Sequence, residues 1–426
     1  MKAIVLAAGE GARLQPLTST RPKHMISVGS KPILEHVLNA LKTTGIDDVL
    51  IVTHYKEDII RRYFEEGKTV RLKIEYTHQE NIHGTGDALR AAEPFVKDDF
   101  LLVYGDLLFT AEAVKAVIEK HNDRRAAVTL STIPVENTAD YGIVELSDDD
   151  TVKGIVEKPR RGETSSNLAN AGIYVFDTDI FSKICKTSSS ARGELEIPDA
   201  ISLYLREGKT VTAAQLLGED WLDIGRPWDL LRANQWVLRR MKHRILGTVE
   251  HGASLLGPVT VAETARIRSG AYIEGPALVD EGADVGPNCF IRPFTTLGKH
   301  TRIGNACEIK FSLLMDNVHV GHLSYVGDSI LGERCNLGAG TVTANYRFDA
   351  GSVKMMVKNE VIDSGLKKLG AVLGDKVKTG INALLMPGVK VGHDSWVGPN
   401  VVLERDLPPD SKITLRQNLE TGALPS

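Results

Sequence analysis

The hydrophobic positions of the first 244 residues follow two alternating patterns. Short apolar runs at Ala3–Ala8, Asp48–Thr53 and Phe100–Tyr104 are typical of buried strands. Between the first two, Ile33–Leu41 places its apolar residues three and four apart, as an amphipathic helix does. Further elements are predicted as helices at Glu57–Glu66, Gly86–Val96 and Pro227–His243, a strand at Leu72–Tyr76, and a hairpin of Gly142–Leu146 and Val152–Glu157. Strands that alternate with helices predict an α/β domain with a mostly parallel sheet.

The second half of the chain follows a six-residue repeat instead of a helical period. Glycine follows the repeating residue at eleven positions. The repeating residues, in runs broken by slips of register, are Val285, Ile291, Leu297, Ile303, Ile309, Val320, Val326, Leu331, Leu337, Leu373, Thr379, Leu385, Val391, Val397 and Leu403. Such hexads are the signature of a parallel β-helix, in which the repeated side chain points inward and three hexads form one triangular coil.

Glycine content places the boundary between the two halves. Residues 1–244 hold 16 glycines, whereas residues 245–426, a shorter stretch, hold 23. We therefore predict a first domain at 1–226, a linking helix at 227–244 and a β-helix at 245–426.

Composition excludes several classes of function. The net charge of −4 gives no general attraction to nucleic acid or to anionic lipid. No run of 18 apolar residues is present, so no membrane span is predicted. The four cysteines form no Cys-x-x-Cys pair, which argues against a thiolate zinc site and favours reduced thiols in a cytoplasmic protein.

The segment after the first predicted strand carries candidate phosphate-binding chemistry. Gly9 and Gly11 form a Gly-x-Gly pair, which by itself is more often a simple turn. Here, however, the run from Leu6 continues through Arg13 and Pro16-Leu17-Thr18 to Lys23. It resembles the signature of sugar-phosphate nucleotidyltransferases. The resemblance implies that the loop binds a nucleoside triphosphate and that Arg13 and Lys23 hold its phosphates, with Lys23 at the transferred α-phosphate.

Two further features occur in the order that this family shows. Gln79 precedes Gly84 and Thr85, and the resemblance implies that it reads a pyrimidine base; alone, it would be an ordinary residue before a helix. Asp106 ends a predicted strand and Asp223 lies in a Trp-Leu-Asp-Ile-Gly run. An Asp at a strand end can equally be a turn residue, but in the family these two positions bind Mg²⁺, which prefers carboxylates and phosphates.

The sugar contacts are implied by the same resemblance, which covers residues 1–240. It places Gly142 and Asn170 against the sugar, Glu157 at its hydroxyls and Lys158 at its phosphate. The implied fold is a Rossmann-like nucleotidyltransferase domain followed by a left-handed parallel β-helix. The implied reaction is attack by a sugar 1-phosphate oxygen on the α-phosphorus of a triphosphate, with loss of pyrophosphate.

The repeat region carries a second group of candidate residues. The run from His322 to Asp328, with Arg292 and Lys310 upstream, resembles the acetyltransferase half of bifunctional sugar-1-phosphate nucleotidylyltransferase/acetyltransferases. His322 is implied as the base that takes the amine proton. Arg292 and Lys310 would hold the sugar phosphate, and Tyr325 and Asn336 would contact the same substrate. The residues implied near acetyl-CoA are Ala339, Asn345 and Tyr346.

Several alternatives stay open from the sequence. The first half looks more like glucose-1-phosphate thymidylyltransferases, and the Lys-rich stretch after Tyr346 looks like the archaeal-type bifunctional proteins. These departures leave UTP or dTTP, and a gluco or galacto amino sugar, undecided, with Lys354 a candidate CoA contact. One rival function is nucleotidyl transfer alone with a structural β-helix; another is a non-catalytic scaffold.

We also predict a homotrimer, because four apolar residues are expected to face outward on the β-helix: Phe311, Leu313, Leu314 and Met315.

Overall fold

The computed structural model describes residues 1–160, 162–190 and 193–422. The chain divides into two compact units. The first comprises Met1–Glu10, Arg21–Ile26 and Lys31–Ile224. The second comprises Gly11–Thr20, Ser27–Ser30 and the chain from Gly225 onward. Each unit is described separately below.

A mixed sheet forms the centre of the first unit. Its main path runs β10-β9-β11-β6-β1-β4-β5, and β8 joins β12 to β11. The strands are β1 (Ala3–Ala7), β4 (Asp48–Thr53), β5 (Lys73–His78), β6 (Phe100–Tyr104), β8 (Val128–Pro134), β9 (Gly142–Leu146), β10 (Val152–Glu157), β11 (Leu168–Phe176) and β12 (Val211–Gln215). β1 pairs in parallel with both β4 and β6, which confirms the predicted parallel core, and β9 and β10 form the predicted hairpin.

The sheet is buried on both faces because its strands carry apolar residues at successive positions. Ala3, Val5 and Ala7 pack into one hydrophobic cluster, whereas Ile4 and Leu6 pack into another. Six helices of this unit are α1 (Ile33–Thr43), α2 (Glu57–Phe64), α3 (Thr85–Arg90), α4 (Ala111–Arg124), α5 (Ile180–Lys186) and α6 (Ile197–Arg206).

One predicted helix is shorter than expected. The sequence predicts a helix over Gly86–Val96, but α3 ends at Arg90 and a separate 3₁₀ turn covers Glu93–Phe95. Pro94 explains the difference, because proline lacks a backbone N–H and its ring clashes with the preceding turn of an α-helix.

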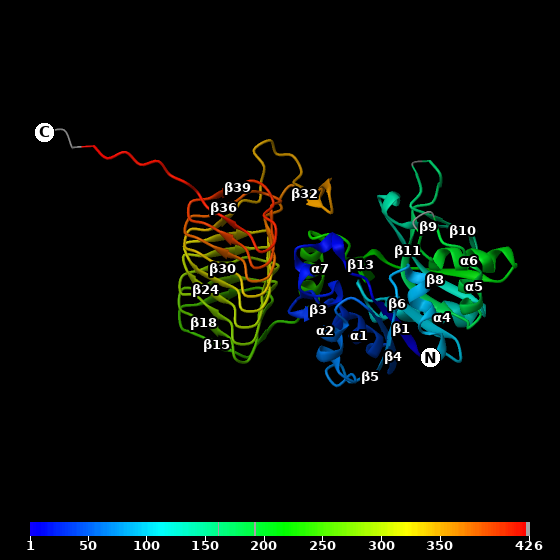
Figure 1. The fold of residues 1–426 in the computed structure, drawn as a ribbon. Coiled ribbons are helices and arrows are strands. Elements are labelled where there is room, and N and C mark those ends of the chain that lie inside the picture. The colour runs from blue at the N-terminus through cyan, green and yellow to red at the C-terminus, as the bar shows by residue number, and fades with distance from the viewer. Residues whose placement is uncertain (161, 191–192, 423–426) are drawn as a thin grey trace. The chain divides into compact units, whose positions relative to one another are not determined.

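The second unit contains helix α7 (Asp229–Arg240) and a parallel β-helix with three faces. The first face comprises β14 (Arg244–Ile245), β17 (Val259–Val261), β20 (Ala277–Val279), β23 (Thr295–Leu297), β26 (Leu313–Leu314), β29 (Ile330–Leu331), β34 (Val372–Leu373) and β37 (Lys390–Val391). The second face comprises β15 (Thr248–Val249), β18 (Arg266–Ile267), β21 (Asp284–Val285), β24 (Arg302–Asn305), β27 (His319–His322), β30 (Asn336–Leu337), β35 (Lys378–Thr379), β38 (Trp396–Val397) and β40 (Lys412–Ile413). The third face comprises β16 (Ser254–Leu256), β19 (Tyr272–Glu274), β22 (Phe290–Ile291), β25 (Glu308–Lys310), β28 (Tyr325–Gly327), β31 (Val342–Thr343), β36 (Leu384–Leu385) and β39 (Val402–Leu403). Figure 1 shows these strands stacked coil upon coil.

The hexad residues form the interior of this solenoid, as predicted. All fourteen aliphatic members belong to one hydrophobic cluster, and Thr379 is also buried. The arrangement is that of a left-handed parallel β-helix. The repeat breaks between β31 and β34, where the chain forms an antiparallel hairpin of β32 (Lys354–Val357) and β33 (Glu360–Asp363).

One group of residues lies differently from the prediction. Leu313, Leu314 and Met315 are no more than 2% exposed, so the expectation that they form an uncovered outer surface is wrong. Leu314 points into the solenoid core, and β26 packs against α7. Phe311 is half-buried and meets Phe294 edge to face. These residues therefore give no support for a trimer.

Across the described ranges, the helices lack the combination of length and apolar character that a membrane crossing requires.

Candidate functional site

Lys23 and Asp106 form an ion pair at the ends of two parallel strands. Asp106 follows β6, and β6 pairs with β1 so that Leu6 lies opposite Tyr104. Lys23 begins a 3₁₀ turn and donates a hydrogen bond to Asp106 Oδ2. A Cβ on Gly9 would lie 3.7 Å from Lys23 Cε, so the loop after β1 passes directly beside the lysine side chain. Four of the predicted residues, Leu6, Gly9, Lys23 and Asp106, therefore converge here.

The surroundings keep this pair charged. Burial would raise the pKa of Asp106, but the positive charge of Lys23 and the hydrogen bond that Lys23 donates hold it below its usual value. His24 is 1% exposed, and burial together with the neighbouring Lys23 charge lowers its pKa to about 3. His24 is therefore neutral near pH 7, and Lys23 supplies the positive charge of this site.

Asp223 lies close to Asp106 across a two-stranded ladder. β7 (Leu107–Phe109) pairs antiparallel with β13 (Trp221–Asp223), and Asp223 stands opposite Leu107. Both carboxylates thus flank the same end of the ladder. Two carboxylates completed by ligand phosphates match the oxygen ligands that Mg²⁺ prefers, so these residues fit the predicted metal.

Gln79 is buried in a hydrogen-bond network with Asp87 and Arg90. Its side chain is 2% exposed, and its Nε2 donates to Asp87 Oδ2 at 2.9 Å and to the Gly84 carbonyl at 3.4 Å. Arg90 donates to the other Asp87 oxygen at 2.6 Å. The side-chain amide is therefore held in one orientation, as a residue that recognises a base requires.

The glycine turn beside Gln79 depends on a close backbone contact. Gly84 has a φ of +98°, and a Cβ there would lie 2.4 Å from the Leu195 carbonyl oxygen. Gly86 donates its N–H to that oxygen at 2.8 Å, and Thr85 Oγ1 accepts from the Ile197 N–H at 3.2 Å. The segment before α6 therefore fixes this turn.

The predicted sugar contacts lie on β9, β10 and β11. Gly142 stands opposite Glu157, and a Cβ on Gly142 would lie 2.7 Å from Glu157 Oε2, so the glycine makes room for the carboxylate. Lys158 follows Glu157 and donates its N–H to the Tyr141 carbonyl at 2.9 Å. Asn170 Nδ2 donates to the Tyr174 hydroxyl at 2.7 Å.

The loop residues Gly11 and Arg13 belong to the second unit. Gly11 has a φ of +69° and precedes the 3₁₀ turn Ala12–Leu14, and Thr18 Oγ1 donates to its carbonyl at 3.0 Å. Arg13 is exposed. A shared phosphate site for Arg13 and Lys23 remains a prediction.

In the second unit, two predicted cations lie on neighbouring strands of the third face. Arg292 follows β22 and pairs with Glu308 at 2.9 Å, with its guanidinium 5.6 Å from the Phe290 ring centre. Lys310 ends β25 and pairs with Asp328 at 2.7 Å. Each cation thus has a carboxylate partner, so a bound phosphate must compete with Glu308 and Asp328.

Tyr325 and Asn345 complete this cluster. Asn345 Nδ2 donates to the Tyr325 hydroxyl at 3.1 Å and also to Asp328 Oδ2. Burial raises the pKa of Tyr325. A Cβ on Gly327 would lie 2.4 Å from the Tyr325 hydroxyl oxygen and 2.7 Å from Asn345 Nδ2, so only glycine leaves room for this arrangement.

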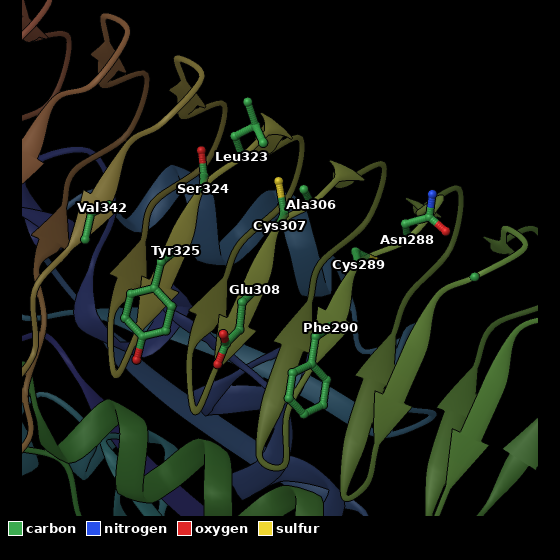
Figure 2. Close-up of a pocket in the computed structure, with 11 residues that line it drawn as sticks. Asn288, Cys289, Phe290, Ala306, Cys307, Glu308, Leu323, Ser324, Tyr325 and Val342 are labelled. Carbon is green, nitrogen blue, oxygen red and sulfur yellow. The ribbon is translucent and has the colours of Figure 1, made fainter.

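An open groove of about 560 Å³ runs along the same face. Figure 2 shows Phe290, Glu308 and Tyr325 on three successive strands, with their side chains directed to the same side. Register agrees, because Phe290 stands opposite Glu308, and Glu308 stands opposite Tyr325. The groove offers an aromatic and acidic floor beside the two cations.

The remaining acyl-site residues lie elsewhere on the solenoid. His322 ends β27 on the second face, is exposed, and accepts through its carbonyl from Ser324 Oγ at 2.7 Å. Asn336 is exposed on the same face, on β30. Ala339 accepts from the Asn382 N–H at 2.8 Å, and Tyr346 is 49% exposed. Within one chain, the predicted residues of the acetyl-transfer site therefore lie on both the second and the third face of the β-helix.

No role is predicted from the sequence for Asp87, Glu308 or Asp328. The last two stand inside the recognised motifs, but each pairs with a cation on a neighbouring coil, Glu308 with Arg292 and Asp328 with Lys310. Asp87 likewise meets its partner only through folding, which brings it beside Gln79.

Residues 2–240 match the nucleotidyl transferase family, and residues 273–386 match the GMPPB C-terminal domain. A bifunctional protein GlmU from Methanocaldococcus jannaschii is 41% identical over 419 residues, covering 98% of both chains. A bifunctional sugar-1-phosphate nucleotidylyltransferase/acetyltransferase from Sulfurisphaera tokodaii is 40% identical, covering 96% of this chain and 98% of its own. A Bacillus anthracis structure assigned as a glucose-1-phosphate thymidylyltransferase is 30% identical with a TM-score of 0.51, covering 57% of this chain and 98% of its own.

Proposed function

This chain belongs to the family of bifunctional sugar-1-phosphate nucleotidylyltransferase/acetyltransferases, and on that premise we propose the substrates and residues of its two reactions. The membership confirms the predicted enzyme with two transferase activities and decides against a non-catalytic scaffold. In our proposal, one site acetylates the amino group of glucosamine 1-phosphate or its galacto epimer from acetyl-CoA. The other site joins the acetylated sugar 1-phosphate to UTP or dTTP.

The Lys23–Asp106 ion pair carries the proposal for nucleotidyl transfer. An oxygen of the sugar 1-phosphate forms a bond to the α-phosphorus, and the bond to pyrophosphate breaks with its electron pair on the leaving group. Lys23 neutralises charge that develops on the transferred phosphoryl oxygens. Mg²⁺, when held by Asp106 and Asp223, would add positive charge at the same phosphates.

Four further residues of the first unit, and Arg13 of the second, would position the substrates. Both N–H groups of the Gln79 amide are engaged by Asp87 and Gly84, so its Oε1 would accept a hydrogen bond from the base edge. Glu157 would accept from sugar hydroxyls. Gly142 leaves space for Glu157, so the two act together. Lys158 and Arg13 would hold the sugar phosphate and the triphosphate, respectively.

The cluster of cations on the third face supports acetyl transfer. Arg292 and Lys310 would exchange their carboxylate partners for the sugar phosphate. The free amine forms a C–N bond to the thioester carbonyl, the C–S bond breaks, and the CoA thiolate leaves. His322 would take the amine proton and return it to that thiolate. Tyr325, Asn336 and Asn345 would orient the two substrates.

The distribution of these residues supports a homotrimer. Lys310 and Tyr325 lie on the third face, whereas His322 and Asn336 lie on the second. A rotation axis beside the solenoid would bring the third face of one copy toward the second face of the next, which completes the site. Light scattering at micromolar concentration should give three times the chain mass; a fully acetylating monomer would contradict the shared site.

A product screen by mass spectrometry tests the proposed substrates. Four nucleoside triphosphates are each incubated with Mg²⁺ and with glucosamine, galactosamine or glucose 1-phosphate, with and without acetyl-CoA. We expect UTP or dTTP to give the acetylated amino-sugar nucleotide. With an amino-sugar 1-phosphate as substrate, this product should form only when acetyl-CoA is present. Nucleotide sugars without any acetylated product would instead favour the rival with a structural β-helix.

A further inference from the structure

A half-exposed tryptophan stands between two lysines on the second face of the β-helix. Trp396 on β38 is 50% exposed. It lies in register with Lys378 on β35 and with Lys412 on β40. The Nζ atoms of these lysines lie 5.7 Å and 5.9 Å from the centre of the indole ring. The intervening residues Thr379 and Val397 are buried, so the alternation of the strands directs all three side chains outward.

The two lysines differ from other lysines of the same coils. Lys376 pairs with Asp394 at 3.4 Å and Lys390 pairs with Asp406 at 3.5 Å. In the described part of the chain, neither Lys378 nor Lys412 lies within 4 Å of a carboxylate. An exposed aromatic face with two uncompensated positive charges thus stands on this part of the solenoid. A cation–π contact explains why one lysine lies against the indole ring. It does not explain why the ammonium groups of both lysines lack a carboxylate partner.

The position of this group links it to the acyl site. Asn336 stands directly opposite Lys378 in the parallel register, so Asn336, Lys378, Trp396 and Lys412 form one outward row on four successive coils. At the ordinary spacing of neighbouring strands, Trp396 lies about 10 Å from Asn336 along the row. A ligand that reaches Asn336 at one end can therefore contact the indole at the other.

We propose that Trp396, Lys378 and Lys412 bind the adenosine 3′-phosphate end of acetyl-CoA, with the adenine stacked on the indole and the phosphates at the ammonium groups. This inference rests on the proposed acetyl transfer. Acetyl-CoA carries its thioester and its nucleotide at opposite ends of a long arm, so the protein must hold them at separate places. An aromatic ring between two cations matches a purine with phosphates, and the row leads from the reaction site to this platform.

Intrinsic fluorescence with adenosine 3′,5′-bisphosphate tests the platform without any catalysis. This probe reproduces the nucleotide end of CoA and has no thioester. We expect saturable quenching in the wild type that disappears in Trp396→Leu. The matched control is Trp236→Leu, in which the lost ring also lies against an arginine, Arg240, at 3.8 Å, and quenching should persist. No quenching in the wild type, or equal quenching in Trp396→Leu, would overturn the proposal.

Steady-state kinetics provide the second test. Stacking of a base on an aromatic ring is worth roughly five- to hundredfold in affinity, so Trp396→Leu should raise the KM for acetyl-CoA by about tenfold or more. The kcat for acetylation and the rate of nucleotidyl transfer should each stay within about twofold. Trp396→Phe, which keeps a ring, should recover most of the loss. If the wild type acetylates and Trp396→Leu has the same KM for acetyl-CoA, the platform is refuted.

The lysines have their own readout. Replacing Lys378 or Lys412 by Met should reduce the preference for acetyl-CoA over acetyl-3′-dephospho-CoA, whereas Lys376→Met, which removes a lysine already paired with Asp394, should not. An equal preference in all three variants would contradict the phosphate role. A wild type with no acetyl transfer would refute the proposed function, and the fluorescence titration would still decide the nucleotide platform.

Discussion

Replacement of Gly327 by alanine should impair acetyl transfer while leaving the fold and the other reaction intact. A Cβ at this position would lie 2.4 Å from the Tyr325 hydroxyl oxygen and 2.7 Å from Asn345 Nδ2. Ordinary contacts with a Cβ begin near 3.4 Å, so these groups must retreat by about 1 Å. The backbone of Gly327 is not in the left-handed region, so alanine adds no strain there.

The size of the effect follows from this displacement. The retreat breaks the 3.1 Å hydrogen bond between Asn345 and Tyr325, which is worth about 0.5–1.5 kcal/mol. A misplacement of about 1 Å among positioning groups can cost up to ~10²-fold in rate. We therefore expect kcat/KM for acetylation to fall about 10- to 100-fold. Because the crowded atoms are the ends of two side chains, the melting temperature should fall by only about 2–4 °C.

The assay follows CoA release with glucosamine 1-phosphate and measures nucleotidyl transfer in parallel. The control is Gly321→Ala, because a Cβ at Gly321 on the neighbouring β27 meets no atom within 4 Å. Gly321→Ala should retain wild-type kinetics. If Gly327→Ala acetylates as fast as Gly321→Ala, the Tyr325–Asn345 arrangement is not part of the acetyl-transfer site.

Three further predictions concern the named residues. Asp223→Asn should abolish formation of the sugar nucleotide and spare acetylation, because the carboxylate stands beside Asp106 in the first unit; loss of both activities in a folded variant would contradict two separate sites. His322→Ala should lower acetylation by ~10²–10⁴-fold, the usual contribution of a general base, with nucleotidyl transfer unchanged; full activity across pH 6–9 would make His322 structural. The pKa of Asp106 lies below its usual value, so its pairing with Lys23 stabilises the fold fully above about pH 4 and loses this effect as pH falls further. Asp106→Asn should therefore weaken the fall in unfolding free energy on acidification below about pH 4, measured by denaturant titration, and an unchanged pH profile would argue against the pair.

Local patterns predicted most of the fold. The buried strands β4 and β6 and the hairpin β9–β10 have the predicted bounds, because each is a short apolar or alternating run between turn residues. The hexads identified fourteen aliphatic residues of the solenoid core, since one inward side chain on each of the three faces leaves a repeat of six in the sequence. They did not identify Leu314 or the inward residues of the earlier coils, such as Val261 and Ile273.

Tertiary contacts explain what the sequence did not predict. Leu313 and Met315 are buried although hexad phase gave them no inward position, and β26 carries the packing with α7, a helix that lies about 75 residues earlier in the chain. The partners Asp87, Glu308 and Asp328 became visible only when folding placed them beside Gln79, Arg292 and Lys310. Motif matches identified the candidate residues, whereas their pairing and their division between two faces required the structure.

We propose that one chain performs two successive transfers on one sugar 1-phosphate. The most direct measurement is the mass spectrum of products after purified protein is incubated with glucosamine 1-phosphate, carbon-13-labelled acetyl-CoA, UTP and Mg²⁺. We expect a nucleotide sugar that carries the labelled acetyl group, with pyrophosphate and CoA as the other products. A nucleotide sugar without the label, or a labelled sugar phosphate that never reaches the nucleotide, would contradict it.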